Sequence, residues 1–389
     1  MKARSKEIVP LPFAWYFIPT VVIGIFGLSN AVYLAVSHYR VYTDMAYKSF
    51  CAVSRAINCD TVSQSPFSIF LDVPVPVWGV AGYTLFLALL FINRKPLSNE
   101  CRVWPTLFLV SFCFSIYSVV LALISTFYIH SYCIMCVASY GVNFALLYLT
   151  WLTHSRYGRM SMIAGLKHDF RYFIERRKKS VAVLSAVAAL LAALILLFPA
   201  YWKIVSVHLD QTLTVGVTAD GHPWIGAENP ELIITEFTDY QCFQCKKMHF
   251  YLRELVSSYP NKIRLVHRNF PMDHTYHPLV KEPFHVGSAT MALLSFYAVK
   301  KGKFWEANDL LFNIDNRKGY INIREIAEVI GFEAEDFARA VQDGELQYKL
   351  LVDIREGMKL GVLGTPAYLI NGDVYLGYVP PEIIQAVLE

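Results

Sequence analysis

Charged residues are scarce in this sequence of 389 residues. Asp, Glu, Lys and Arg make up 17% of the chain, whereas hydrophobic residues make up 55%. This balance excludes an ordinary soluble protein, in which about a quarter of the residues carry charge, and it implies a membrane part. The apolar residues collect before about residue 202, and the remainder has the composition of a charged globular domain. We therefore expect two unlike domains.

The sequence also lacks a signal for nucleic-acid binding and a signal-peptide cleavage site. The basic residues cluster beside apolar runs, as topology signals do, so the net charge of +4 gives no indication of nucleic-acid binding. The first apolar run is long and lacks the small-residue cleavage site of a signal peptide, so we expect it to be retained.

Five apolar runs are long enough for helices that cross a bilayer, which requires roughly 20 residues. They cover residues 13–36, 75–92, 103–125, 133–152 and 181–202, and Pro74 and Pro76 leave the start of the second run ambiguous. The runs divide the chain into a cytoplasmic N-terminus (1–12), a four-helix transmembrane domain (13–152), a basic cytoplasmic loop (153–180), a fifth transmembrane helix (181–202), a linker (203–230) and an external domain (231–389).

The distribution of Lys and Arg predicts the orientation of these spans. Basic residues crowd the N-terminus, the short connection after the second run and the long connection after the fourth, and such segments remain in the cytoplasm. The loop 37–73 carries few basic residues, and the connection near His130 carries none. Both connections are therefore expected outside, and the fifth span then delivers the C-terminal domain to the extracytoplasmic side.

Six of the eight cysteines fall on that outer side. They form three pairs: Cys51 with Cys59 in the first outer loop, Cys133 with Cys136 at the outer end of the fourth span, and Cys242 with Cys245 in the external domain. Disulfides persist outside the cytoplasm, and the CxxC spacing of two pairs favours reversible dithiol chemistry. Cys101 and Cys113 have no partner in this scheme and are expected to act as small apolar side chains.

The external domain contains a strand, a CxxC motif and a helix in succession. Residues 231–238 have the pattern of a buried strand, and Cys242 and Cys245 follow at the start of a predicted helix. A cysteine at a helix N-terminus has its thiolate stabilised by free amide groups and the helix dipole. Cys242 is therefore the expected nucleophile and Cys245 the resolving thiol. The spacings of the nearby histidines match no zinc-finger pattern, so no metal is expected; these are His249, His267, His274, His277 and His285.

The external domain resembles the DsbA-like branch of the thioredoxin superfamily. The resemblance rests on the CxxC motif and on Thr365-Pro366, and it implies a cis Pro366 against the redox pair, where adjacent backbone can pair with a peptide. It also implies that Glu236 is the acidic residue buried beneath the pair, although an ordinary strand-end carboxylate is the alternative. The helical pattern of residues 274–359 matches the inserted helical region of the family. The dipeptide Phe243-Gln244 is neither Pro-His nor Gly-Pro, so the direction of electron flow remains open.

The membrane part resembles the vitamin K epoxide reductase family, whose bacterial members include fusions to a thioredoxin-like domain. The matching features are Cys51 and Cys59, the serine at position 65, the CxxC of Cys133 and Cys136, and a tyrosine at position 140. The resemblance implies four transmembrane helices around a quinone, either ubiquinone or menaquinone, in the bacterial inner membrane. We find no counterpart of the asparagine that animal members place near the quinone, so simple quinone reduction is expected rather than epoxide reduction.

The spacing of these residues predicts their roles. A CxxC at the lipid boundary cannot readily meet a folded domain, whereas cysteines on a mobile outer loop can, so Cys51 and Cys59 are the expected shuttle. Tyr140 lies one turn after Cys136, where its hydroxyl could bond a quinone oxygen; interfacial aromatic packing is the alternative. Ser65 either orients the loop or the ligand or forms a Ser-Pro turn with the next residue.

These features predict a multi-domain protein in which an all-α transmembrane bundle precedes an α/β thioredoxin-fold domain. The expected function is oxidation of reduced extracytoplasmic protein substrates: Cys242-Cys245 takes their electrons, the loop pair passes them to Cys133-Cys136, and quinone is the acceptor. Membrane lipid is the other expected partner. A quinol-driven thiol reductase or isomerase is one alternative. A redox sensor is another, which fits poorly because no cytoplasmic loop is long enough for an output domain.

Overall fold

The computed structural model describes residues 11–54, 56–92, 103–158, 160–197, 200–203, 213–314 and 322–388. The chain divides into two compact units, unit 1 (Met1–Lys203) and unit 2 (Ile204–Glu389). Cys101 lies outside the described residues.

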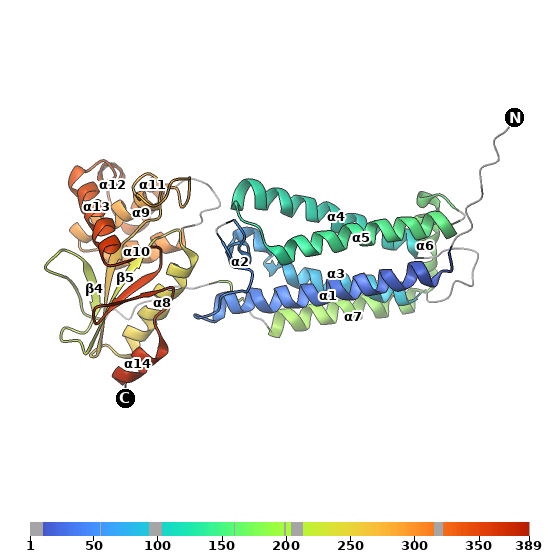
Figure 1. Cartoon of the computed structure of the whole chain (residues 1–389), viewed down its shortest axis with the longest axis horizontal. Helices are drawn as coiled ribbons and strands as arrows, with labels where there is room; N and C mark the ends of the chain where they lie inside the picture. Colours follow the sequence, from blue (N-terminus) through green and yellow to red (C-terminus); the bar gives the residue numbers. More distant parts are fainter. Residues whose placement is uncertain are drawn as a thin grey trace. The chain divides into compact units, whose positions relative to one another are not determined.

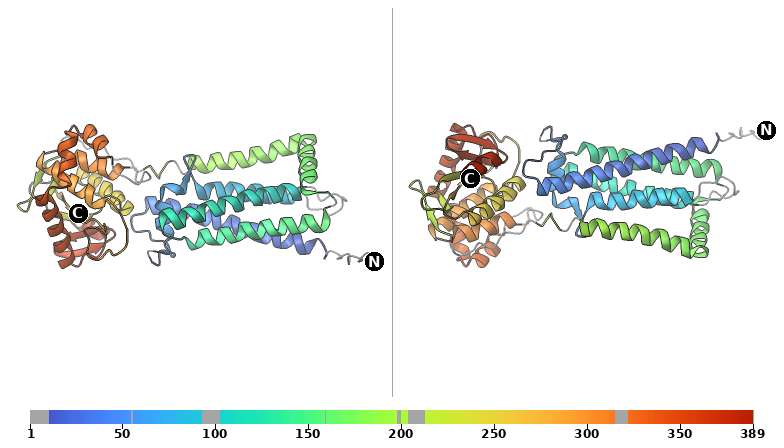
Figure 2. Two further views of the ribbon diagram at one scale, coloured as in Figure 1. Left: turned by 90° about the horizontal axis from the view of Figure 1, so that it is seen from above. Right: turned by 90° about the horizontal axis from the view of Figure 1, so that it is seen from below.

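Unit 1 is a bundle of apolar helices that run alongside one another (Figures 1 and 2). The long members are α1 (Ala14–Thr43), α3 (Val75–Ile92), α4 (Trp104–Ile124), α5 (Ile134–Tyr157) and α7 (Arg177–Leu197). By length and composition α1, α5 and the stretch Trp104–Ile129 could each cross a membrane, and α6 with α7 forms a further candidate bent by 89°. The apolar helix over Val75–Phe91 is shorter. A five-pass topology therefore stays a prediction.

The bundle packs closely where small residues face large ones. Its buried cluster includes Phe86 on α3, Trp104 on α4 and Leu146 on α5. A Cβ added at Gly27 on α1 would lie 2.6 Å from the Tyr83 ring, so only glycine lets α1 approach α3 at this position. Close helix contact through small residues is typical of apolar helices in lipid.

The basic segment 153–180, expected as a loop, is mostly helical. Helix α6 (Met162–Glu175) lies across the end of the bundle (Figure 2). Its buried Asp169 accepts hydrogen bonds from the backbone N–H groups of Val103 (2.8 Å) and Thr106 (3.2 Å). These amides belong to the start of α4 and have no partner within that helix, so α6 provides their cap. Ile163 and Phe170 remain exposed on α6, as in a helix that lies at a membrane surface.

The end of α7 is held against α1 and the segment before α3. The Tyr201 hydroxyl lies 2.7 Å from Nδ1 of the buried His38, and the other ring nitrogen of His38 lies 3.1 Å from the Ser68 hydroxyl. Lys203 forms a 2.7 Å ion pair with Asp72. The last described residues before the connection to unit 2 are therefore fixed to unit 1.

Unit 2 is built on a sheet of six strands in the order β3-β4-β6-β5-β7-β8. The neighbours β5 and β6 are parallel and the other pairs are antiparallel. The strands are β3 (Val215–Val217), β4 (Pro223–Gly226), β5 (Leu232–Thr238), β6 (Ile263–Asn269), β7 (Ala367–Ile370) and β8 (Asp373–Leu376). Two of them, β3 and β4, fall within the expected linker 203–230. The sheet therefore begins earlier than expected, because β4 gains its partner β6 from a distant part of the chain.

Helices cover this sheet. Helix α8 (Phe243–Ser258) follows β5 directly, and the expected helical region lies between β6 and β7. It consists of α9 (Ser288–Lys300), α10 (Phe304–Asn313), α11 (Ile323–Ile330), α12 (Ala334–Ala340) and α13 (Gly344–Lys359), and α14 (Pro381–Leu388) ends the unit. Phe237, Phe270 and Ile354 are among the buried residues that join the sheet to the helices. The expected class, an all-α apolar domain followed by an α/β domain of thioredoxin type, is confirmed.

Candidate active sites

Unit 1 holds a disulfide between Cys51 and Cys59. Their Cα atoms are 5.6 Å apart. Cys51 lies in the irregular segment that follows α1, whereas Cys59 is the first residue of the short helix α2 (Cys59–Gln64). Both side chains are buried. The loop that was expected to be mobile therefore packs its disulfide inside unit 1 in this structure.

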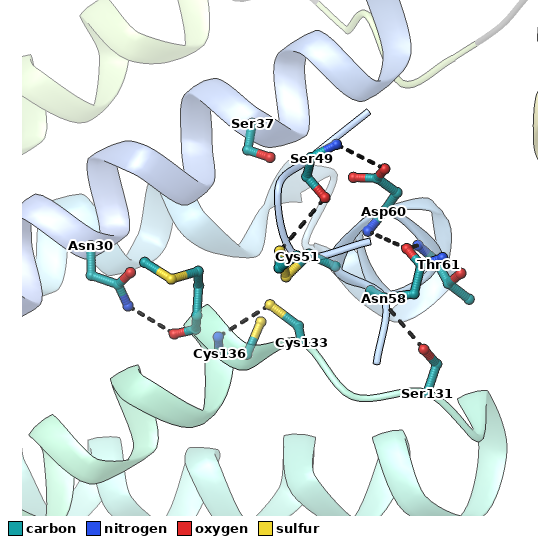
Figure 3. Close-up of a disulfide and its surroundings, with 12 residues drawn as sticks. Asn30, Ser37, Ser49, Cys51, Asn58, Asp60, Thr61, Ser131, Cys133 and Cys136 are labelled. Atoms are coloured by element: carbon teal, nitrogen blue, oxygen red, sulfur yellow. Dashed lines mark hydrogen bonds between the residues drawn. A yellow bond between two sulfur atoms is a disulfide. The ribbon is translucent and has the colours of Figure 1, made fainter. Parts of the chain in front are cut away.

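Main-chain contacts attach the Cys59 end of this loop to the start of α5. Asn58 caps α2 by accepting hydrogen bonds from the backbone N–H groups of Asp60 (3.0 Å) and Thr61 (3.2 Å) (Figure 3). The Asn58 N–H donates to the Tyr132 carbonyl (2.9 Å), and the Tyr132 N–H donates to the Ala56 carbonyl (2.8 Å). Cys59 directly follows Asn58 and Cys133 directly follows Tyr132, so both cysteines adjoin the hydrogen bond that joins these two segments.

The second cysteine pair begins α5. Cys133 is the N-cap of this helix, and its sulfur accepts a hydrogen bond from the backbone N–H of Cys136 (3.1 Å). Cys51, Cys59 and Cys133 form one buried cluster, against which Cys136 and Met135 pack in part (Figure 3). The loop disulfide therefore lies against the CxxC pair, which is the arrangement that disulfide exchange between the two pairs requires.

Tyr140 and Ser65 differ in their surroundings. Tyr140 lies on α5 one turn after Cys136, and its electrostatic partners include Cys136, Cys133 and the Ser125 side chain. In contrast, the Ser65 hydroxyl donates to the Val62 carbonyl (2.8 Å) at the end of α2. This local bond favours the turn interpretation of Ser65. Of the two remaining cysteines, Cys113 lies exposed on α4 rather than packed in the bundle.

Asn30 was missed by the sequence analysis. From α1 its amide nitrogen donates to the Met135 carbonyl (2.8 Å) and to the Ser139 hydroxyl (2.7 Å), both in the first turns of α5. Its amide oxygen is buried without a hydrogen-bond partner. An asparagine within an apolar span is a signal of function, because a polar group is costly there. The unpaired oxygen beside the CxxC turn can accept a hydrogen bond from a ligand hydroxyl, such as that of a quinol, whereas the Tyr140 hydroxyl could donate to a quinone carbonyl.

The third cysteine pair begins α8 of unit 2 in the same manner. Cys242 is the N-cap, its sulfur accepts from the Cys245 N–H (3.3 Å), and its thiol donates to the Thr365 carbonyl (3.6 Å). The Thr365–Pro366 peptide bond is cis. The hydrogen bond with Cys245 lowers the pKa of Cys242; burial opposes this effect, and the charge of His285 adds to it. Burial raises the pKa of Cys245 well above the ordinary value. Cys242 is therefore the better nucleophile.

Glu236 lies on β5, buried within a network of two histidines. Its Oε1 accepts hydrogen bonds from Nδ1 of His249 (2.7 Å) and Nδ1 of His267 (3.0 Å). Burial acts to raise the pKa of Glu236, but the charge of His249 and both hydrogen bonds lower it to about 2. Tyr368, opposite Glu236 in the sheet, has a buried hydroxyl without a partner and interacts electrostatically with Cys245 and Glu236. The expected carboxylate thus lies between the sheet and the redox helix.

The same three side chains could in principle hold a metal. The ligand atoms of Glu236, His249 and His267 lie within 4.8 Å of one another, and one carboxylate with two imidazoles is a known zinc ligand set. However, both Nδ1 atoms lie at hydrogen-bond distance from a single carboxylate oxygen. This geometry is that of N–H donors, and the absence of a metal stays a prediction.

A second acid–histidine pair lies on the Cys242 side of α8. The buried Asp239 accepts from Nδ1 of His285 (2.9 Å), from the Met272 N–H (2.6 Å) and, through its other oxygen, from the Gln241 N–H (2.7 Å). No local sequence pattern indicates the pair, because its members are 46 residues apart.

These geometries define a class of protein. Each CxxC pair places its first sulfur at a helix N-terminus, where thiolates are stabilised, and a disulfide packs against one pair. Such centres carry out thiol–disulfide exchange. Residues 18–151 match the family model of the vitamin K epoxide reductase family, and residues 218–389 match a thioredoxin model. The chain therefore consists of a vitamin K epoxide reductase family domain followed by a thioredoxin-like domain, and the apolar helices of the first domain are suited to a membrane by length and composition.

Similar solved structures cover less than half of this chain. They include a thioredoxin-like oxidoreductase from Silicibacter pomeroyi (24% identity, 44% of this chain and 91% of that chain, TM-score 0.36). The thiol-disulfide exchange protein alpha-DsbA2 from Wolbachia pipientis is 21% identical over 42% of this chain and 84% of that chain, with a TM-score of 0.34.

Among curated sequences, the Na(+)/H(+) antiporter NhaA 3 of Salinispora tropica is 24% identical over 174 residues, which are 45% of this chain and 25% of the antiporter. The NhaA of Herminiimonas arsenicoxydans is 23% identical over 42% of this chain and 24% of that protein. The chain thus spans about a quarter of the length of the curated relatives it matches.

Proposed function

We propose that the chain forms disulfide bonds in extracytoplasmic proteins and passes the electrons to a quinone. The proposed topology is five-pass, with unit 2 on the periplasmic side of the bacterial inner membrane. The observation that supports the proposal best is the single buried cluster of Cys51, Cys59 and Cys133, because it joins the loop disulfide to the membrane CxxC.

The proposed relay consists of balanced exchange steps. A substrate thiolate attacks Cys242, the Cys242–Cys245 bond breaks, and a second substrate thiolate releases the substrate as a disulfide. The reduced pair then passes two electrons to Cys51–Cys59 by the same exchange, and that pair passes them to Cys133–Cys136. A quinone bound beside Cys136 would supply the oxidant, taking two electrons and two protons from this last dithiol.

The residues around the membrane pair would have distinct tasks. Asn30 holds the main chain between Cys133 and Cys136 through the Met135 carbonyl. The Tyr140 hydroxyl would donate to a carbonyl of the quinone, whether ubiquinone or menaquinone, and the free amide oxygen of Asn30 would accept from a hydroxyl of the quinol that forms. On the substrate side, backbone next to Pro366 would pair with the substrate peptide.

The test is the redox state of Cys242–Cys245 in isolated membranes. We expect oxidised quinone to convert the prereduced pair to a disulfide, and we expect the pair to stay reduced in a Cys133→Ser variant. Thiol alkylation and gel mobility measure the redox state. Oxidation at the same rate in both proteins would contradict the relay. Reduction of the pair by added quinol, without oxidation by quinone, would instead support the alternative, a quinol-driven reductase or isomerase.

A further inference from the structure

The two residues between Cys242 and Cys245 provide no charge for the Cys242 thiolate. Phe243 is apolar, and the Gln244 side chain donates from its amide to the Gly377 carbonyl (3.5 Å). A reactive thiolate usually has a cation or a protonated imidazole nearby, in addition to the helix N-terminus. Helix α8 carries Lys246 and Lys247 directly after the pair, and a positive group can also come from another part of unit 2.

His285 lies in the connection before α9 and is held there by several contacts. Its Nδ1 bonds the buried Asp239 (2.9 Å), and its ring stacks on Phe284 with 4.0 Å between ring centres. Its backbone adopts φ +43°, in the left-handed region that costs energy for a residue with a side chain, and its carbonyl accepts from the Ser288 N–H (2.9 Å). The side chain is 21% exposed, so the ring can exchange protons with the solvent.

We propose that His285, oriented by Asp239, is the counter-charge of the Cys242 thiolate, so that Asp239, His285 and Cys242 act as a charge-linked set at the substrate face. The inference rests on the proposed function and names the group that tunes its first thiol. Nδ1–H of His285 donates to Asp239, and this hydrogen bond fixes the tautomer and the orientation of the ring, as carboxylates do for imidazoles in other proteins. Main-chain geometry brings the segments of the two residues together, because the Cys242 N–H donates to the Asp239 carbonyl (3.0 Å) and the Gln241 side-chain amide donates to the Val286 carbonyl (2.6 Å). The charge of His285 then acts on Cys242 in the direction of thiolate formation.

Other charged groups surround this set. Burial acts to raise the pKa of Asp239, but His285 and the backbone N–H bonds lower it, so Asp239 stays ionised. Its negative charge opposes the Cys242 thiolate, whereas the hydrogen bond with Cys245 and the charge of His285 favour it. Asp273 belongs to the same connection and accepts from the Gly287 N–H (2.7 Å).

The chemical consequence concerns the leaving group. When the second substrate thiolate attacks the mixed disulfide, the bond between Cys242 and the substrate sulfur breaks and Cys242 departs with the electron pair. Protonated His285 stabilises that departing thiolate. The substrate is oxidised by two electrons and the Cys242–Cys245 pair is reduced, so no additional oxidant is needed at this step.

The experiment uses the full-length protein, reduced, in detergent and without quinone or substrate. Alkylation of Cys242 by iodoacetamide is followed by peptide mass spectrometry across about pH 4 to 9. We expect His285→Gln to shift the thiolate titration upward by about one pKa unit, which is about tenfold less thiolate on the acidic side. His285→Lys should keep the thiolate titration as low as in the unchanged protein, because lysine restores a positive charge at this position.

His274→Gln is the matched control, because His274 lies in the same connection, 3.5 Å from Asp273. Its profile should match the unchanged protein. A His285→Gln profile that coincides with that of the unchanged protein would overturn the inference, and so would a His285→Lys profile identical to that of His285→Gln. The assay contains neither quinone nor substrate, so a failed quinone relay with a shifted profile would refute the proposed function alone.

Discussion

The side-chain amide of Asn30 on α1 donates a 2.8 Å hydrogen bond to the main-chain carbonyl of Met135, between the two cysteines of the membrane CxxC motif. The same nitrogen donates to Ser139 one turn later (2.7 Å). A residue 105 positions away in the sequence thus fixes the turn that carries Cys133 and Cys136. Water cannot replace these hydrogen bonds in apolar surroundings, so their loss should directly destabilise the CxxC turn.

Asn30→Ala should therefore slow quinone-driven oxidation of Cys242–Cys245. Loss of a hydrogen bond worth about 0.5–1.5 kcal/mol corresponds to roughly a two- to tenfold lower rate. The rate is measured by alkylation in membranes at saturating quinone. Ser111→Ala is the control, because the Ser111 hydroxyl bonds only within its own helix, to the Leu107 carbonyl (2.8 Å), among the hydrogen bonds of the described residues. Equal rates for both variants would show that Asn30 has no such role.

Glu236 should make the stability of unit 2 depend on pH at the acid end. Its folded-state pKa of about 2 lies below the unfolded value of about 4.3. The stabilisation by the carboxylate is therefore complete above about pH 4.3 and is lost as the pH falls toward 2. The charge of Glu236 raises the pKa of His249 against the effect of burial, so the contribution of His249 is complete below about pH 6.5 and is lost as the pH rises through its folded value.

Glu236→Gln should remove the acid-side loss and lower the stability near neutral pH by about 3–5 kcal/mol, the cost of breaking a buried ion pair. Hydrogen exchange of peptides from β5 and α8 measures both effects in the full chain. Glu231→Gln is the control, because Glu231 is exposed and lies 3.8 Å from Lys262. If the Glu236→Gln protein lost as much stability in acid as the unchanged protein does, this assignment would be contradicted.

Much of this architecture follows from local sequence pattern. Long apolar runs predict the helices of unit 1, and the strand before Cys242 with the helix after it predicts the redox turn, because both signals lie within a few neighbouring residues. Sequence spacing also identified the three cysteine pairs, and the disulfide between Cys51 and Cys59 joins two of these residues.

Contacts between distant segments cannot be predicted from local sequence pattern. The pairs Asn30 with Met135 and Asp239 with His285 form only after the helices and strands have packed, so no periodicity reveals them. The short strands β3 and β4 were missed because β4 pairs with β6 from a distant segment rather than repeating a local pattern. The buried state of Cys51 and Cys59 was missed because burial depends on α5, which lies far along the chain.

The loop pair should be an obligate carrier between the other two pairs. Replacing both Cys51 and Cys59 with serine should leave Cys242–Cys245 reduced in cells while Cys133–Cys136 becomes oxidised, because the membrane pair loses its donor but keeps its acceptor. Alkylation followed by gel mobility reports all three pairs. Cys113→Ser, which alters the exposed cysteine of α4, should behave as the unchanged protein. Oxidation of the external pair at the normal rate in the double variant would remove the loop from the relay.

The sharpest prediction concerns the sulfur atoms that meet within unit 1. Cys59 begins α2, and Asn58 holds that end of the loop to Tyr132, next to Cys133. Cys51 instead lies in an irregular segment, which can move outward at a smaller loss of main-chain contacts. We therefore expect Cys59 to exchange with Cys133 and Cys51 to meet Cys242.

Cys136→Ala should trap a mixed disulfide between Cys133 and Cys59, since the thiol that would resolve it is gone. Non-reducing peptide mapping identifies the linked peptides, and Cys133→Ala is the matched variant, in which no adduct should accumulate. An adduct of Cys133 with Cys51 would exchange the roles of the two loop cysteines. A stable loop adduct in the Cys133 variant and none in the Cys136 variant would reverse the order within the CxxC pair, and Cys133 rather than Cys136 would then face the electron acceptor.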